Sequence, residues 1–268
     1  MGDDLQDGLA RAVGTSGRWR EVERLEVTDS TNAVVATRAR AGAPPGLVVV
    51  ADHQTAGRGR FGRRWEDRPG GSLLVSCLVD APPRPTLVPL AVGLALADVI
   101  AGAGAEPELK WPNDVLIAGR KCAGVLVEAP TPPQPLVIGI GMNTDWRSEA
   151  RAGSPATHPA HPPGSPAPPW TSLAEELGRD VDRYDILVHL LDALDRRLDV
   201  VEQNPDALLV SYRAMCATLS RHVDVETPGG PLRGLAADVD ERGSLLVHTD
   251  TGTAVIESGD VTHLRLMP

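Results

Sequence analysis

A run of glycines and arginines between two strongly apolar segments is the feature that most limits how this chain can fold. Residues 54–65 read QTAGRGRFGRRW, and apolar runs at 47–51 and 73–78 lie close on either side. Glycine lets the backbone adopt positive φ and approach a ligand closely. Arginine presents a fixed charge and a planar fork of donors that fits carboxylate and phosphate oxygens. The pattern predicts an anion-binding loop between two buried strands; a solvated Arg/Gly turn or a disordered RNA-binding segment is the alternative.

Composition restricts the partners of such a loop. A hydrophobic content of 42% and a charged content of 23% are ordinary for a soluble globular protein, and the net charge of −10 argues against general nucleic-acid binding. No apolar run approaches the roughly 20 residues that a membrane span needs, so we expect neither a nucleic-acid nor a membrane partner. Three widely spaced cysteines show no disulfide or metal-site spacing. We therefore expect a reduced, cytoplasmic protein with a local anion site.

The hydrophobic pattern predicts an N-terminal extension (1–24), a large α+β domain (25–218) and a small C-terminal β-barrel (219–268). Strands are expected before the barrel at 23–27, 46–53, 72–79, 108–111, 115–117, 121–128 and 134–140. Helices are expected at 33–41, 86–101, 172–177 and 184–201, with another starting at Asn204. Five barrel strands are expected at 223–226, 232–239, 245–248, 254–256 and 261–266. The proline-rich stretch 147–169 predicts a low-complexity loop outside the core.

Several segments supply parts for an acyl-adenylate reaction, in which a carboxylate attacks the α-phosphate of a nucleotide and two anions must be screened. Lys110 and Lys121 are the only lysines among 26 basic residues, which suggests that a compact ammonium is needed there. Ser30 and Thr31 can cap a helix or present hydroxyls to a ligand. Candidate amide contacts and adenine platforms are Asn113, Asn143, Trp65 and Trp170.

Five motifs together resemble those of biotin–protein ligases of the monofunctional bacterial type. They are Asp29-Ser30-Thr31-Asn32, the stretch 54–65, Lys110-Trp111-Pro112-Asn113-Asp114, the segment 120–128 and Gly139-Ile140-Gly141-Met142-Asn143. The resemblance covers roughly residues 25–268. It implies an α+β fold, with a mixed sheet and helices like those of class II aminoacyl-tRNA synthetases, and an SH3-like C-terminal barrel.

The resemblance also implies an activity and its residues. Biotin and ATP would give biotinyl-5′-AMP with Mg²⁺, and biotin would pass to a lysine in the biotin carboxyl carrier domain of an acyl-CoA carboxylase. The biotin site would comprise Ser30, Thr31, Asn32, Gln54, Gly57, Arg58, Lys121, Gly124 and Leu126. The ATP site would comprise Arg60, Trp65, Lys110, Asn113, Lys121, Asn143 and Trp170, with Lys121 and Arg58 catalytic and no residue assigned to the metal. A monomer or weak homodimer is expected.

Two departures accompany the resemblance: the residue after Lys121, and the proline-rich stretch before Trp170, which resembles an insertion. Cys122 stands where Leu, Ile or Val is expected, and its size should preserve the packing. Strict alternation in a strand places Lys121 and Leu126 on opposite faces, so a bulge or irregular turn is required if both touch one ligand.

The alternatives are a lipoate–protein ligase, which shares the adenylate chemistry, and a biotin-sensing repressor. The ~25 residues before the motifs are too few for a helix-turn-helix domain, so we expect no DNA-binding domain.

Overall fold

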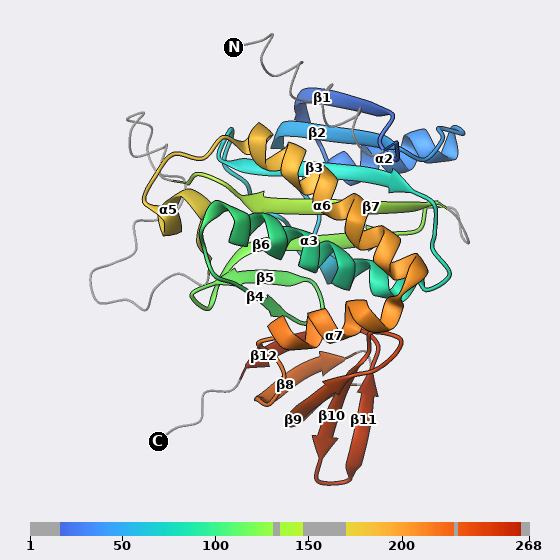
Figure 1. The fold of residues 1–268 in the computed structure, drawn as a ribbon, viewed down its shortest axis with the longest axis vertical. Helices are drawn as coiled ribbons and strands as arrows, with labels where there is room; N and C mark the ends of the chain where they lie inside the picture. Colours follow the sequence, from blue (N-terminus) through green and yellow to red (C-terminus); the bar gives the residue numbers. More distant parts are fainter. Residues whose placement is uncertain (1–16, 131–134, 147–169, 228–229, 264–268) are drawn as a thin grey trace.

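A seven-stranded mixed sheet forms the larger part of the protein, in the order β1-β2-β3-β7-β6-β5-β4 (Figure 1). The computed structural model describes residues 17–130, 135–146, 170–227 and 230–263. The first two strands run parallel, and every other neighbouring pair is antiparallel. The strands are β1 (Glu21–Thr28), β2 (Leu47–Gln54), β3 (Ser72–Val79), β4 (Pro107–Lys110), β5 (Asp114–Ile117), β6 (Arg120–Glu128) and β7 (Leu136–Asn143).

Strand β3 lies inside the sheet because its eight residues are all apolar or small, and all of them are buried. It pairs with β2 on one side and with β7 on the other. A strand that is apolar on both faces requires cover on both faces of the sheet. Since β2 delivers the Gly/Arg loop and β3 receives it, the loop starts and ends on the best-buried part of the sheet.

Helices α3 (Val88–Ala103) and α6 (Arg183–Gln203) cover one face of the sheet (Figure 1). The segment Pro85–Ala103, which joins the short 3-10 helix η2 (Pro85–Leu87) to α3, is 19 residues long and apolar enough to cross a membrane by length and composition. The sequence-based expectation that no apolar run approaches that length was wrong. Since 67% of its most apolar window is buried and α3 packs against α6 and β6, its apolar character serves the protein core.

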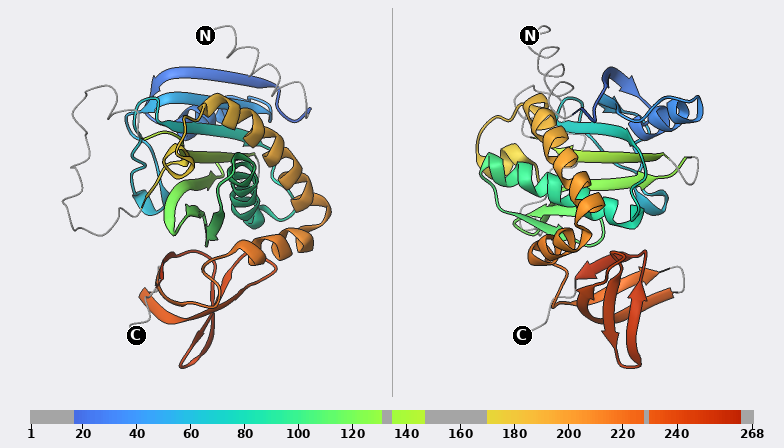
Figure 2. Two further views of the ribbon diagram at one scale, coloured as in Figure 1. Left: turned by 60° about the vertical axis from the view of Figure 1, so that its left-hand side comes forward. Right: turned by 45° about the vertical axis from the view of Figure 1, so that its right-hand side comes forward.

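Helix α2 (Thr31–Arg40) covers the opposite face of the sheet and packs against β2, β3 and β7 (Figure 2). Its buried Val35 and Ala36 pack against Val49, Leu78 and Val137 in a small cluster separate from the main core. Because α2 covers only one end of this face, the rest is open to the Gly/Arg loop, which contains the short helix η1 (Arg60–Gly62).

Five antiparallel strands form a second sheet in the order β11-β10-β9-β8-β12. They are β8 (His222–Thr227), β9 (Gly230–Val239), β10 (Leu245–Thr249), β11 (Gly252–Ile256) and β12 (Asp260–His263). Helix α7 (Pro205–Met215) precedes this sheet. The indole of Trp111 donates a hydrogen bond to the carbonyl of Gly243 at 2.9 Å, and Arg213 pairs with Asp238 at 2.7 Å. These contacts join the two sheets.

The predicted fold class is confirmed: helices cover a mixed sheet, and a small antiparallel sheet follows. Each predicted helix and strand among the described residues is present, with ends that differ by a few positions. Helix α5 (Leu173–Leu177) begins after Ser172, whose hydroxyl accepts from the backbone N–H of Glu175. The expected loop at 147–169 and the first sixteen residues lie outside the described part.

A charged cluster around Asp52 ties β1 and β2 to α6. Arg24 and Arg183 approach this carboxylate at 2.5 and 2.6 Å, and the hydroxyl of Tyr184 donates to it at 2.8 Å. Burial alone would raise the pKa of Asp52, but the hydrogen bonds from Arg24 and Tyr184 and the charge of Arg183 outweigh it and lower that pKa. The carboxylate therefore stabilises the fold above its unfolded pKa of about 3.9, and this contribution is lost as the pH falls through the lower folded pKa.

We predict that Asp52→Asn lowers the melting temperature at pH 7 by roughly 2–4 °C, the effect of about 1 kcal/mol in a chain of this size. The difference from wild type should narrow below about pH 4, since the wild-type carboxyl then becomes protonated. Thermal unfolding between pH 3 and 7 measures this. Asp250→Asn, in an exposed turn, is the control. A difference that stays constant across the range would contradict the assignment.

Candidate active site

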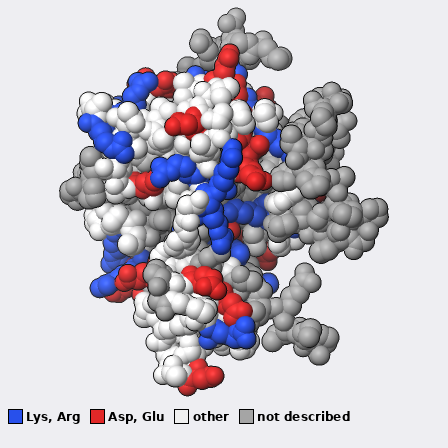
Figure 3. Space-filling model, turned by 180° about the vertical axis from the view of Figure 1, so that it is seen from behind, with Lys and Arg blue, Asp and Glu red and all other residues white. Residues whose placement is uncertain are grey.

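The Gly/Arg loop encloses a cavity of about 140 Å³ on the face of the sheet that carries α2. Lys and Arg side chains gather near the middle of this face, opposite α3 and α6 (Figure 3). Residues predicted for the biotin and ATP sites that line this cavity are Ser30, Thr31, Asn32, Gln54, Arg58, Arg60, Trp65, Asn113, Lys121, Gly124 and Leu126. The structure thus brings together residues from four of the five sequence motifs, and Gly139, Ile140 and Gly141 of the fifth also line the cavity.

Polar groups at the start of α2 form one side of the pocket. The side-chain oxygen of Gln54 accepts from the backbone N–H of Thr31 at 2.8 Å and from its hydroxyl at 3.1 Å, and Ser76 donates to that hydroxyl at 2.7 Å. Ser30 occupies the N-cap position, but its side chain makes no capping hydrogen bond. The buried Ser30 hydroxyl lies beside outward-pointing backbone N–H groups of the helix start. This arrangement suits a polar ligand group better than a purely structural cap.

A β-bulge turns Lys121 into the pocket. The pairing of β5 with β6 shifts between Val115, opposite Ala123, and Leu116, opposite Lys121, so Cys122 is an extra residue on β6. The bulge reverses the alternation, and Lys121 comes to line the same cavity as Leu126. The sequence-based requirement for a bulge is therefore confirmed.

The Lys121 ammonium has two neighbours in the pocket. Its Nζ lies 2.5 Å from Oδ1 of Asp114 and 5.5 Å from the ring centroid of Trp65. The carboxylate balances the ammonium charge, and the indole face is attractive to a cation. Both contacts hold the ammonium at the cavity wall.

Glycines on β6 and β7 make room for the side chains above them. A Cβ on Gly139 would lie 2.0 Å from Oδ1 of Asn32, and one on Gly141 would lie 2.4 Å from the indole of Trp65. The pairing of β7 is regular on both sides, so a bulge does not explain these glycines. Glycine is required at both positions because another side chain lies directly against the backbone there. The indole N–H of Trp65 is buried and has no hydrogen-bond acceptor among the described residues.

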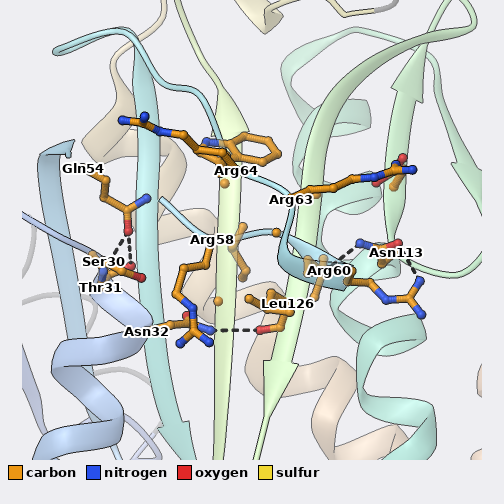
Figure 4. Close-up of a pocket in the computed structure, with 18 of the residues that line it drawn as sticks. Ser30, Thr31, Asn32, Gln54, Arg58, Arg60, Arg63, Arg64, Asn113 and Leu126 are labelled. Carbon is orange, nitrogen blue, oxygen red and sulfur yellow. Dashed lines mark hydrogen bonds between the residues drawn. The ribbon is translucent and has the colours of Figure 1, made fainter. Parts of the chain in front are cut away.

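The loop itself closes as a small hairpin over the pocket. Gly59 donates its N–H to the carbonyl of Arg63 at 2.7 Å, and Trp65 donates to Gly57 at 3.0 Å. Phe61, at the tip, has a φ of 55° and is 57% exposed. Figure 4 shows Ser30, Thr31 and Gln54 on one side of the pocket, Arg60 and Asn113 on the other, and Arg58 between them.

Glu128 anchors the middle of this arrangement. Its carboxylate lies 3.1 Å from the guanidinium of Arg58 and accepts from the side-chain amide of Asn32 at 2.8 Å. Glu128 and Asp114 belong to the sequence motifs, but sequence reasoning assigned neither a role. The available signal was electrostatic: a pocket this rich in cations needs carboxylates nearby.

Four predicted residues do not line the cavity. Gly57 packs beneath Trp65, and Lys110 lies on β4, paired with Asp114 in the register. Asn143 is buried and donates to the carbonyl of Thr171 at 2.9 Å. Trp170 stacks edge-on against Trp146 with ring centroids 4.7 Å apart. Their ligand contacts remain predictions.

Two further features of this region are the Cys122 thiol and the side chains available to a metal ion. Burial raises the pKa of the Cys122 thiol to about 12, and the charge of Glu176 adds to the effect. The thiolate is the reactive form, so this buried cysteine serves packing. Among the residues that the structure describes, no group of three or more His, Cys, Asp or Glu side chains could hold a metal ion.

Two protein families match the chain in sequence. Residues 24–143 match the Biotin/lipoate A/B protein ligase family, and residues 218–264 match the Biotin protein ligase C terminal domain. The biotin–[acetyl-CoA-carboxylase] ligase of Mycobacterium tuberculosis is 36% identical, over 97% of this chain and 94% of that protein. The bifunctional ligase/repressor BirA of Bacillus subtilis is 30% identical, over 88% of this chain and 72% of that protein.

A solved structure agrees with these sequence matches. The biotin protein ligase from Aquifex aeolicus, in complex with biotin and ATP, matches with a TM-score of 0.75 and 26% identity over 92% of this chain and 100% of that one. The similarity spans both sheets, which confirms the ligase-like fold expected from the sequence.

We predict that Glu128→Gln makes the loop at 57–65 about two- to fivefold more susceptible to trypsin. The substitution removes an ion pair worth up to about 1 kcal/mol, so Arg58 is held less firmly and the loop opens more often. The rate of the first cleavage after the loop arginines, followed by mass spectrometry, is the readout. Glu241→Gln, in an exposed turn, should leave the rate unchanged. Equal cleavage of wild type and Glu128→Gln would show that the pair does not hold the loop.

Proposed function

This chain belongs to the biotin protein ligase family, and we propose that its pocket joins biotin to ATP and then transfers biotin to a protein lysine. The products of the first step are biotinyl-5′-AMP and pyrophosphate. The acceptor is a lysine of a biotin carboxyl carrier domain in an acyl-CoA carboxylase. We also propose a division at 218/219 between the catalytic and C-terminal domains, and an N-terminal extension at 1–24.

The observation that carries the proposal is the charge of the cavity lining. Among the described lining residues, Arg58, Arg60, Arg63, Arg64 and Lys121 are cationic, and Asp114 is the only carboxylate. Adenylation requires this imbalance because the biotin carboxylate and the ATP α-phosphate repel each other until positive charge lies between them. A neutral or acidic pocket would raise the barrier.

We propose that each side of the pocket binds one part of the ligand. The hydroxyls of Ser30 and Thr31 and the amide of Gln54 bind the polar ring of biotin, and the apolar side chain of Leu126 lies beside its hydrocarbon chain. Arg60 and Asn113, on the opposite side, bind the nucleotide. Arg58 lies between the two sides (Figure 4) and Lys121 lines the same cavity, so both are proposed to face the reacting groups.

In the first step, a carboxylate oxygen of biotin attacks the α-phosphorus of ATP. The bond from that phosphorus to the bridging oxygen breaks, and pyrophosphate leaves. In the second step, the acceptor amine attacks the biotinyl carbonyl carbon, the bond to the AMP oxygen breaks, and the amine loses a proton. Lys121 stabilises the charge that develops in both steps because its ammonium is held beside the reacting oxygens.

We propose that magnesium binds together with the nucleotide. Its charge would offset that of the pyrophosphate leaving group. The described residues offer no cluster of three acidic, His or Cys side chains, so phosphate oxygens and water suit the ion better than a protein cage. Lys110, Asn143 and Trp170 are further proposed contacts on the nucleotide side.

We further propose that the enzyme acts in the cytoplasm as a monomer or weak homodimer, without a nucleic-acid or membrane partner. The fully reduced cysteines, all three of them buried, support a reducing compartment. The net charge of −10 supports a protein acceptor over a nucleic acid.

A lipoate ligase is the second candidate because the first matched family includes both activities. The match of residues 218–264 to a biotin ligase C-terminal domain favours biotin. Incubation with ATP, magnesium and either biotin or lipoate, followed by mass spectrometry of the adenylate, separates the two. We expect biotinyl-5′-AMP. Lipoyl-AMP alone would favour the rival, and no adenylate with either acid would refute both.

We predict that Lys121→Ala slows adenylate formation by about 10²–10³-fold, the typical effect of removing one preorganised stabiliser of developing charge. The melting temperature should change little, since the Lys121 side chain is 33% exposed. Lys121→Arg should recover only part of the rate because its fork is bulkier than an ammonium. Single-turnover kinetics measures all three enzymes. Arg196→Ala, exposed on α6 across the sheet, is the control; a wild-type rate in Lys121→Ala would disprove the role.

A further inference from the structure

Arg60 of the Gly/Arg loop reaches across the protein to the C-terminal sheet. Its Nη2 donates to the hydroxyl of Ser258 at 2.7 Å, and its Nη1 donates to the carbonyl of Gly259 at 3.2 Å. The same Nη1 donates to the side-chain oxygen of Asn113 at 3.3 Å. The contacts to Ser258 and Gly259 join residues 198 and 199 positions apart in the chain. These three acceptors are neutral oxygen atoms, and together they orient the guanidinium.

The acceptors are themselves held in place. Ser258 and Gly259 form the turn between β11 and β12. A Cβ on Gly259 would lie 2.6 Å from Cγ1 of Val225, so the backbone of this turn is pressed against the core of the C-terminal sheet. Asn113 is fixed by its own amide, which donates to the carbonyl of Val125 at 2.8 Å. Arg60 is therefore oriented by two rigid elements, one from each sheet.

A second cavity gives Arg60 an alternative direction. This cavity, of about 450 Å³, lies between the two sheets and is lined by Trp111, Arg242 and Glu257 together with Ser258. Arg60 and Asn113 line both this cavity and the proposed active site. The guanidinium thus lies in the wall that the two cavities share. Losing a hydrogen-bond acceptor on this wall would free the Arg60 guanidinium to turn away from the nucleotide.

We propose that Ser258 is a positioning residue for adenylation. Its hydroxyl holds the Arg60 guanidinium toward the nucleotide side of the active-site pocket, so the C-terminal sheet controls how well the enzyme retains ATP and the adenylate. Ser258 acts through Arg60 and does not contact biotin. This inference rests on the proposed ligase function and assigns the C-terminal sheet a part in it.

The test compares Ser258→Ala with Ser258→Thr, which retains a hydroxyl. We expect Ser258→Ala to raise the KM for ATP and the dissociation rate of biotinyl-5′-AMP by about three- to tenfold, the scale of one lost hydrogen bond to a charged group that keeps other partners. The kcat and the Kd for biotin should change less than twofold, and Ser258→Thr should restore ATP binding. Thr251→Ala, which removes a hydroxyl from the β10–β11 turn of the same sheet, should match wild type.

A double-mutant cycle makes the test specific. In an Arg60→Ala background, Ser258→Ala should cause no further rise in the KM for ATP, because the group that it positions is gone. A further rise there, equal losses in the Ala and Thr variants, or a wild-type KM in Ser258→Ala would each overturn the proposal. If wild type itself forms no adenylate, the ligase function fails and this proposal fails with it. Melting temperatures of all variants identify any loss of folding.

Discussion

Mutual repulsion among five cationic side chains around one cavity is the constraint on which the rest of this site depends. Arg58, Arg60, Arg63, Arg64 and Lys121 all line it. Each cation that the structure ties down has a specific partner: Asp114 beside Lys121, Glu128 beside Arg58, and the turn at 258–259 beside Arg60. These partners hold the charges in place without cancelling them all, so an anionic ligand gains more here than on the surrounding acidic protein.

The backbone supplies the room that this charge arrangement needs. The sequence predicted the strands on either side of the loop because their apolar runs are long and continuous, as in β3. It also required a bulge or an irregular turn if Lys121 and Leu126 touch one ligand, since strict alternation places their side chains on opposite faces of the strand. The glycines of β7 indicated that another group approaches this strand closely, but not which group. Their reason, contact with Asn32 and Trp65, exists only after distant segments fold together.

The features that the sequence did not predict are mostly contacts between two residues that lie far apart in the chain. The motifs identified the residue types of the pocket, but not that Glu128 pairs with Arg58 or that Arg60 contacts the C-terminal sheet, because such partners depend on tertiary geometry. The residues placed away from the cavity illustrate the same limit. Trp170 looked like a free aromatic platform in a proline-rich context, yet its ring packs against Trp146. The apolar helix at 85–103 was overlooked as a candidate span because its extent depends on how η2 joins α3.

Amide hydrogen exchange at residues 57–65, with and without biotin, tests the central claim most directly. If an anionic ligand offsets the excess positive charge of the pocket, binding should order the loop and slow exchange at these amides, while exchange in α6 stays constant. Biotin methyl ester, which lacks the carboxylate charge, should slow exchange much less than biotin. Equal exchange in the free and biotin-bound protein would contradict the account.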